Sequence, residues 1–125
     1  MIELAGNLIV EDGKILLLYS KDEGHWEVPG GKVEEDESPT EAARREAKEE
    51  IGVEVELEKP FYTGEFQHDG DIFLWNGYLA QIIEGEPQLQ EDKFERMEWL
   101  SPDELDSIEL APNIELILPA LRNLN

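Results

Sequence analysis

The sequence predicts an α/β fold in which a central sheet lies between helices. Three observations lead to this prediction: apolar, β-branched runs separated by turn signals, a well-capped helical segment before the middle of the chain, and an apolar helical segment near the C-terminus. At 125 residues the chain is long enough for one domain with its own core and too short for two ordinary domains. We therefore predict a single domain over residues 1–125.

Strands are expected in the first part of the chain. Two apolar, partly β-branched runs, Glu3–Val10 and Lys14–Tyr19, flank an Asp-Gly turn signal and predict an antiparallel hairpin. Three leucines in succession, Leu16 to Leu18, indicate that the second of these strands is covered on both faces. A further short strand is expected at Trp26–Val28.

A helix is expected from Pro39 to Ile51. Ser38 and Glu41 have the spacing of a capping box, and proline is favoured at the first helical position. Alanines in the segment favour helix, and Gly52 stands where a residue in the left-handed conformation would end it. The boundaries of this helix therefore follow from short-range signals alone.

The chain beyond this helix is expected to return to sheet. Val53–Leu57 and Phe61–Phe66 have extended character, and Ile72–Ile83 is a long strand that follows a turn signal. The polar segment Gln88–Phe94 predicts a loop over one edge of the sheet, and Arg96–Leu100 predicts a last short strand.

Two helical segments are expected at the C-terminal end. Ser101, Pro102 and Glu104 repeat the cap pattern and predict a short helix. Asn113–Asn123 carries apolar residues with helical periodicity and contains Pro119, so we expect a helix with a kink or a late start that packs on the sheet.

Composition excludes several classes of function. The chain has 31 acidic and 10 basic residues and a formal net charge of −21, which disfavours binding to nucleic acid or to an anionic membrane. It has no cysteine, so disulfides, thiolate metal sites and cysteine nucleophiles are excluded. No apolar run approaches the roughly 20 residues of a membrane span, and the first residues lack the basic start of a secretory signal. A soluble, cytoplasmic protein is therefore expected.

Three glutamates of the predicted helix are expected on one side of it. Glu46, Glu49 and Glu50 stand at positions i, i+3 and i+4, so their carboxylates project within roughly a 100° arc. Like charges so placed repel unless a divalent cation neutralises them, and oxygen ligands of this kind suit Mg²⁺ or Mn²⁺. The plain alternative is an acidic helix face in a chain rich in glutamate.

A longer pattern surrounds these glutamates. The spacing G-x5-E-x7-R-E-U-x-E-E-x-G-U, with U an apolar residue, is filled over residues 31–53 by Gly31, Glu37, Arg45, Glu46, Ala47, Glu49, Glu50, Gly52 and Val53. This stretch resembles the Nudix box, and Trp26–Gly31 is similar to the short strand and tight turn that lead into it. The resemblance implies an α/β/α sandwich with a mixed, mostly antiparallel sheet. It also implies hydrolysis, with Mg²⁺ or Mn²⁺, of a nucleoside diphosphate linked to another moiety.

The resemblance assigns roles to the acidic residues. Glu46 and Glu50 match direct metal ligands across the family, while Glu49 either ligates a metal or orients and deprotonates the attacking water. The backbone carbonyl of Gly30 or Gly31 is expected to complete the metal shell, because glycine permits close approach to the ion.

Arg45 is expected to orient these ligands rather than to touch the substrate. It stands four residues from both Glu41 and Glu49 on the predicted helix, and its family counterpart steadies the glutamate that Glu37 matches. Arg45 and Glu37 are therefore expected to act through their neighbours.

A carboxylate on the late loop assists the metals or serves as the base in many family members. Counting onward from the Gly-Glu-Pro of residues 85–87, Glu91 is the candidate in this chain, with Glu95 and Glu98 as alternatives.

A polyanionic substrate needs positive charge and a surface for its base. The cations near the motif in sequence are Lys21, Lys32, Arg44 and Arg45, and Lys21 and Lys32 are expected to contact phosphate. Phe66 and Trp75 are the residues to test for stacking on the base, although a tryptophan is more often part of the core.

The resemblance narrows the substrate by elimination. The chain lacks the downstream proline typical of ADP-ribose enzymes, the tyrosine typical of dinucleoside polyphosphate enzymes and the extended signature of NADH enzymes. A MutT-like hydrolase of nucleoside triphosphates, including oxidised ones, is therefore favoured over an ADP-ribose or nucleotide-sugar hydrolase. The alternative from another class is a domain that binds a nucleotide or a partner without turnover. Dimers are common in the family, so a homodimer stays open.

Overall fold

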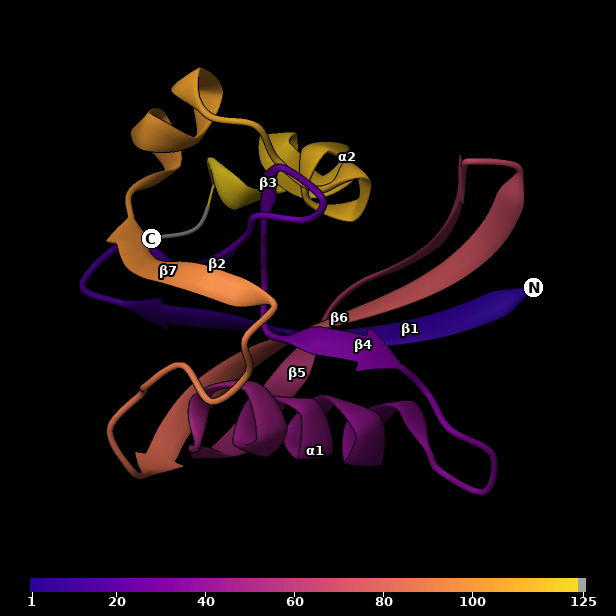
Figure 1. Ribbon diagram of the computed structural model, residues 1–125, viewed down its shortest axis with the longest axis horizontal. Coiled ribbons are helices and arrows are strands. Elements are labelled where there is room, and N and C mark those ends of the chain that lie inside the picture. Colours follow the sequence, from indigo (N-terminus) through magenta and orange to yellow (C-terminus); the bar gives the residue numbers. More distant parts are fainter. Residues whose placement is uncertain (124–125) are drawn as a thin grey trace.

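The structure, a computed structural model, describes residues 1–123 and contains a seven-stranded sheet between α1 and α2 (Figure 1). Strands β3, β2, β1, β6 and β5 follow one another across the sheet, while β4 pairs with β1 and β7 pairs with β2. The α/β prediction is confirmed. In chain order the elements are β1 (Ile2–Glu11), β2 (Lys14–Ser20), β3 (His25–Glu27), β4 (Gly30–Lys32), α1 (Pro39–Ile51), β5 (Glu54–His68), β6 (Asp71–Glu84), β7 (Phe94–Leu100), the 3₁₀ helix η1 (Pro102–Ser107) and α2 (Pro112–Leu121).

Strand β1 holds the sheet together because it pairs with three other strands. It runs parallel to β6 from Ile2 to Ile9, antiparallel to β4 in its first half and antiparallel to β2 at its end. The remaining pairings between named strands of residues 1–123 are antiparallel. The expected mixed, mostly antiparallel sheet is therefore present.

Helix α1 has the predicted boundaries. The Ser38 hydroxyl accepts a hydrogen bond from the Glu41 N–H at 3.2 Å, and the Glu41 carboxylate accepts one from the Ser38 N–H at 3.0 Å. Gly52 ends the helix in the left-handed conformation, with φ of 71°. Its buried apolar face is made mostly of alanine, which lets the helix lie close to the sheet: Ala42, Ala43, Ala47 and Ile51.

Apolar side chains pack on both faces of the sheet, under α1 on one face and under α2 on the other. Leu16 and Leu18 of β2 pack in the core that contains Ala47 and Ile51 of α1. Leu17, between them, packs in the core that contains α2. The prediction that β2 is covered on both faces is confirmed, because neighbouring residues of a strand point to opposite sides.

Strand β5 and helix α2 differ from the sequence prediction. The two extended runs after α1 form one continuous strand, β5, with register shifts on both sides of the Lys59–Pro60 pair. Because β5 is an edge strand, it tolerates the missing N–H of Pro60. Helix α2 begins at Pro112 and includes Pro119 near its end, so the expected late start is wrong.

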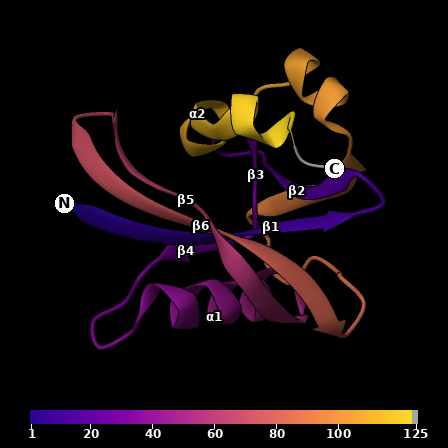
Figure 2. The ribbon, with the colours of Figure 1, turned by 180° about the vertical axis from the view of Figure 1, so that it is seen from behind.

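The turn end of the β5–β6 hairpin bends toward the side of the sheet that α2 covers. Figure 2 shows the turn between β5 and β6 raised beside α2. This turn is formed by Asp69 and Gly70, both with positive φ. Within residues 1–123, none of the helices combines the length and the apolar character that crossing a bilayer requires.

Candidate active site

The acidic side of α1 faces strand β4, and a buried amide fixes the distance between them. Asn7 of β1 donates from its side chain to the carbonyl oxygen of Pro29 at 2.9 Å and to that of Ala43 at 2.8 Å. The first acceptor precedes β4 and the second belongs to α1. A single side chain therefore joins the helix to the residue that leads into the strand opposite its glutamates.

Glu50 is the most deeply buried of the three glutamates, with 0% of its surface exposed. Its Oε1 accepts a hydrogen bond from the Gly30 N–H at 2.9 Å. Its Oε2 lies 3.2 Å from the Nζ of Lys93, in an ion pair that lacks hydrogen-bond geometry. Burial raises the pKa of Glu50 to about 8, with the Glu46 charge adding to the rise and Lys93 and Gly30 opposing it.

Glu46 lies against β4, and this contact explains why residue 31 is a glycine. A Cβ atom at Gly31 would overlap the Glu46 carboxylate, and a Cβ atom at Gly30 would overlap the backbone of β1. Both glycines belong to a strand, so the predicted tight turn at this place is wrong. Burial raises the pKa of Glu46 to about 7, and its contact with Glu49 adds to the rise.

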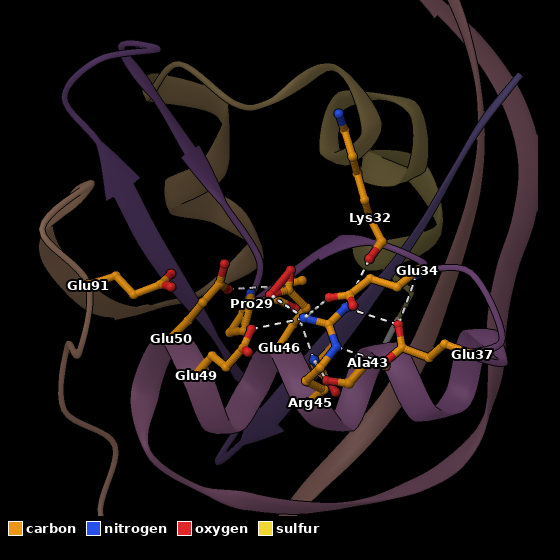
Figure 3. A network of polar contacts seen from close by, with 12 residues as sticks. Pro29, Lys32, Glu34, Glu37, Ala43, Arg45, Glu46, Glu49, Glu50 and Glu91 are labelled. Carbon is orange, nitrogen blue, oxygen red and sulfur yellow. Dashed lines mark hydrogen bonds and ion pairs between the residues drawn. The ribbon is translucent and has the colours of Figure 1, made fainter.

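Arg45 is the centre of an ion-pair network on the outer side of α1 (Figure 3). Its Nε and Nη2 hold Glu37 at 2.7 and 3.0 Å, and its Nη1 holds Glu49 at 2.9 Å. Its Nη2 also donates to the carbonyl oxygen of Lys32 in β4 at 3.0 Å. The hydrogen bond from Arg45 holds the pKa of Glu37 below its ordinary value. The spacing of Arg45 from Glu41 and Glu49 also permits an ion pair with Glu41, but that carboxylate caps the helix instead.

Replacing Arg45 with lysine is expected to lower both stability and activity. An ammonium cannot hold Glu37, Glu49 and the Lys32 carbonyl at once, because it lacks the planar fork of a guanidinium. We expect a loss of about 1–2 kcal/mol in the free energy of unfolding and turnover about 10- to 100-fold lower. Urea unfolding and steady-state kinetics check this. Arg44→Lys, at an exposed neighbour, is the matched control, and equal effects of the two substitutions would contradict the role of Arg45.

The irregular loop of residues 85–93 brings Glu91 and Lys93 to the end of α1. The Gln90 N–H donates to the Glu50 carbonyl oxygen at 2.9 Å, and the Gln88 N–H donates to that of Ile51 at 3.0 Å. Glu91 then lies 3.6 Å from the Nζ of Lys93, which also contacts Glu50. The structure therefore places Glu91 beside Glu50, and Figure 3 shows the two carboxylates on neighbouring segments.

The two alternatives to Glu91 lie elsewhere. Glu95 and Glu98 are exposed residues of β7, and Glu98 pairs with Arg96 at 3.6 Å. Lys93 is a site residue that the sequence prediction missed. Its only local signal is a cation directly after two acidic residues in a chain with few cations.

The donor atoms suit a hard divalent cation. Within residues 1–123, no three acidic or histidine side chains already converge on one point, because Glu49 is turned toward Arg45 and Glu50 toward Gly30. Two buried carboxylate oxygens nevertheless lack a hydrogen-bond partner, Oε2 of Glu50 and Oε1 of Glu91. Buried carboxylate oxygens without partners are costly unless a cation neutralises them.

A cavity of about 370 Å³ adjoins this cluster on the side of α2. Gly30, Gly31 and Lys32 of β4 form one wall, and Phe66 and Phe73 of the β5–β6 hairpin form another. The rings of Phe66 and Phe73 stack with centroids 5.1 Å apart. Strand β4 therefore separates a carboxylate cluster from an aromatic cavity.

The predicted substrate-contacting residues are only partly gathered at this cavity. Lys32 lines it, and Figure 3 shows its side chain pointing away from the carboxylates. Trp75 also lines it but is 1% exposed, which makes it mainly a core residue. Lys21 is exposed in the connection between β2 and β3 and is not part of the cavity wall.

The cavity contains a half-buried acid that the sequence prediction did not include. Glu27 of β3 lines the cavity and pairs with His25, whose Nε2 lies 2.9 Å from its Oε2. Burial raises the pKa of Glu27, and His25 opposes the rise. His25 and His68, to which the sequence prediction assigned no role, both line the cavity.

Comparisons with known proteins match this chain along nearly its whole length. A family model described as the NUDIX domain matches residues 4–121. The chain is 35% identical over 116 residues to the CTP pyrophosphohydrolase of Escherichia coli (strain K12), a match that covers 90% of this chain and 84% of that protein. It is 34% identical over 119 residues to the 8-oxo-dGTP diphosphatase of the same strain, a match that covers 91% of this chain and 90% of that protein.

A solved structure gives the same result. The crystal structure of a MutT NUDIX hydrolase from Burkholderia pseudomallei superposes with a TM-score of 0.87 at 31% identity, covering 94% of this chain and 95% of that one. The acidic pattern of α1, the sheet order and these matches all lead to one family. The chain belongs to the Nudix hydrolase family.

Proposed function

We propose that this protein hydrolyses a nucleoside triphosphate to the monophosphate and pyrophosphate in the presence of Mg²⁺ or Mn²⁺. One observation carries the proposal: Gly30, Gly31 and Lys32 form a wall shared by the carboxylate cluster and the cavity. A substrate whose nucleoside fills the cavity would therefore lay its phosphates along β4, next to Glu46 and Glu50. The names of the two E. coli relatives, a CTP and an 8-oxo-dGTP enzyme, support the triphosphate class.

The metal would be held by Glu46 and Glu50, with a backbone carbonyl of Gly30 or Gly31 and with Glu91 from the loop. When bound, such an ion neutralises phosphate oxygens and withdraws electrons from phosphorus. The Gly30 N–H and the packing of Glu46 on Gly31 fix the two carboxylates before substrate arrives. This fixed geometry matters because phosphoryl transfer depends mainly on positioning and charge neutralisation.

Glu49 is the proposed base. Its carboxylate is the most exposed of the three, at 49%, and Arg45 holds it at 2.9 Å. It accepts a proton from water as the water oxygen forms a bond to phosphorus and the bond from phosphorus to the bridging oxygen breaks. The leaving group departs as pyrophosphate or as the monophosphate, depending on which phosphorus is attacked. The exposed position supports this role, because the base must meet water at the open side of the cluster.

The nucleoside is proposed to lie in the cavity between the β5–β6 hairpin and α2. Phe66 offers a ring at the cavity wall, and aromatic rings bind bases by stacking. Lys32 is proposed to contact a phosphate from the same wall. Trp75 supports the wall from the core, where it packs on Tyr62 with ring centroids 6.0 Å apart.

A panel of nucleotides tests the proposed function. CTP, dCTP, 8-oxo-dGTP, ADP-ribose, a nucleotide sugar and a dinucleoside polyphosphate are each incubated with protein and Mg²⁺, and pyrophosphate, phosphate and monophosphate are quantified. We expect monophosphate and pyrophosphate in equal amounts from a triphosphate. Release of phosphate and diphosphate would contradict the proposed bond. No turnover of any compound would favour a domain that binds without catalysis.

We also propose, from the sequence, that residues 1–125 form a single domain, that the protein is cytoplasmic and that it forms a homodimer. Size-exclusion chromatography with light scattering checks the last of these.

A further inference from the structure

The ammonium of Lys93 lies between two carboxylate oxygens of the site that have no hydrogen-bond partner. Its Nζ is 3.2 Å from Oε2 of Glu50 and 3.6 Å from Oε1 of Glu91. These two atoms are buried and have no hydrogen-bond partner. One positive charge is therefore shared by two carboxylates from two different segments, α1 and the 85–93 loop.

Lys93 contacts a glutamate of α1, whereas the two lysines that the sequence predicts as phosphate contacts do not. Lys21 and Lys32 lie near Gly30 and Gly31 in sequence, but in the described structure neither ammonium contacts a glutamate of α1. Burial acts to lower the pKa of Lys93, but Glu50, Glu91 and Glu46 outweigh it and the pKa lies above its ordinary value. The neighbouring carboxylates therefore favour the charged form of Lys93.

A divalent cation and Lys93 need the same oxygens. A carboxylate oxygen that ligates Mg²⁺ or Mn²⁺ at about 2.1 Å cannot also hold an ammonium in close contact on the same side. The side chain of Lys93 is 50% exposed, and lysine has a flexible four-carbon stem, so it can leave without disturbing the fold. Its Nζ also lies 5.0 Å from the centroid of the Phe94 ring.

We propose that Lys93 competes with the divalent cation for Glu50 and Glu91, and that metal binding releases its ammonium to bind the phosphate chain of the substrate. The inference rests on the proposed function, since it concerns the same site. The chain has a net charge of −21, so it repels a polyanionic substrate unless positive charge is present at the site. An ammonium that moves from the carboxylates to the phosphates supplies this charge.

The test combines two measurements on Lys93→Met. Mn²⁺ affinity is measured without nucleotide by isothermal titration calorimetry at about pH 7.5, where the lysine of the wild type is charged. Mn²⁺ is expected to bind about three- to tenfold more tightly than to wild type, because no ammonium has to be displaced. KM for the nucleotide is expected to rise about tenfold, because one phosphate contact is lost.

The opposite signs separate this role from a structural one. If Lys93 only held the loop in place, Lys93→Met would weaken both metal and nucleotide binding, and that result would overturn the proposal. Unchanged Mn²⁺ affinity, or tighter Mn²⁺ binding with an unchanged KM, would overturn it as well. Lys48→Met is the matched control, because Lys48 is an exposed lysine in the last turn of α1 that pairs with Glu54 at 3.0 Å and not with Glu50 or Glu91.

A second variant keeps the test decisive if Lys93→Met folds poorly. Lys93→Arg retains the charge and is expected to keep both Mn²⁺ affinity and KM within about twofold of wild type. A wild type that binds Mn²⁺ but turns over no nucleotide would refute the proposed function while leaving the competition measurable. A wild type that binds no Mn²⁺ would refute the metal site and this inference together.

Discussion

Replacing Glu50 with glutamine is expected to lower turnover about 10³-fold or more while the protein stays at least as stable as wild type. Glutamine keeps the shape of the side chain and an oxygen that can accept the Gly30 N–H. It removes the anionic oxygen that is buried beside Glu91 and Lys93. Because a buried carboxylate is costly, its loss relieves strain in the folded state even as it removes a metal ligand.

Turnover and urea unfolding are measured on the same preparations. Glu54→Gln serves as the control, because Glu54 is an exposed glutamate just beyond the helix and lies outside the cluster. Unchanged turnover in Glu50→Gln would exclude the site assignment. A large loss of stability would contradict the view that this carboxylate is kept for function.

The free energy of unfolding of the metal-free protein is expected to fall as the pH rises from about 4.5 to about 8. The pKa values of Glu46 and Glu50 are raised from 4.5 to about 7 and about 8 by burial. The folded state therefore binds more protons than the unfolded state in this range. The stability that these groups contribute is complete below the unfolded pKa and is lost as the pH passes through the folded values. For Glu50 the loss is at most about 5 kcal/mol.

Urea unfolding with a chelator at about pH 5 and about pH 8 measures this loss. Glu50→Gln is expected to lose much less stability over the same interval, and Mg²⁺ is expected to restore stability to the wild type at the higher pH because it binds the ionised carboxylates. An equal loss in wild type and Glu50→Gln would show that Glu50 is not the buried acid described.

Helix α1 could be predicted from the sequence because its signals are local. Ser38, Pro39 and Gly52 act within a few residues of the helix ends, and the i, i+3, i+4 spacing alone places Glu46 and Glu50 on one side. Burial of both faces of β2 could be predicted in the same way, since three consecutive leucines in a strand must point to both faces. The motif then identified the family, because its many positions have fixed spacing.

Features that depend on long-range contacts could not be predicted. The two glycines before α1 have a composition typical of a turn, yet they lie in a strand because β1 and Glu46 approach too closely for any side chain. The two extended runs Val53–Leu57 and Phe61–Phe66 join into one strand through Pro60, because an edge position accommodates a proline. Lys93 lies in an irregular loop, where no periodic pattern of the sequence indicates which way a side chain points. It reaches Glu50 only because backbone hydrogen bonds tie its loop to the end of α1.

The most direct test of the central claim is a crystal of the protein soaked in Mn²⁺, with anomalous diffraction used to locate the metal. We expect a peak between Glu46, Glu50 and β4, with the Glu50 Oε2 as a ligand and with Lys93 moved away. Carboxylates that keep their present contacts with no peak between them, at a Mn²⁺ concentration that supports turnover, would contradict it.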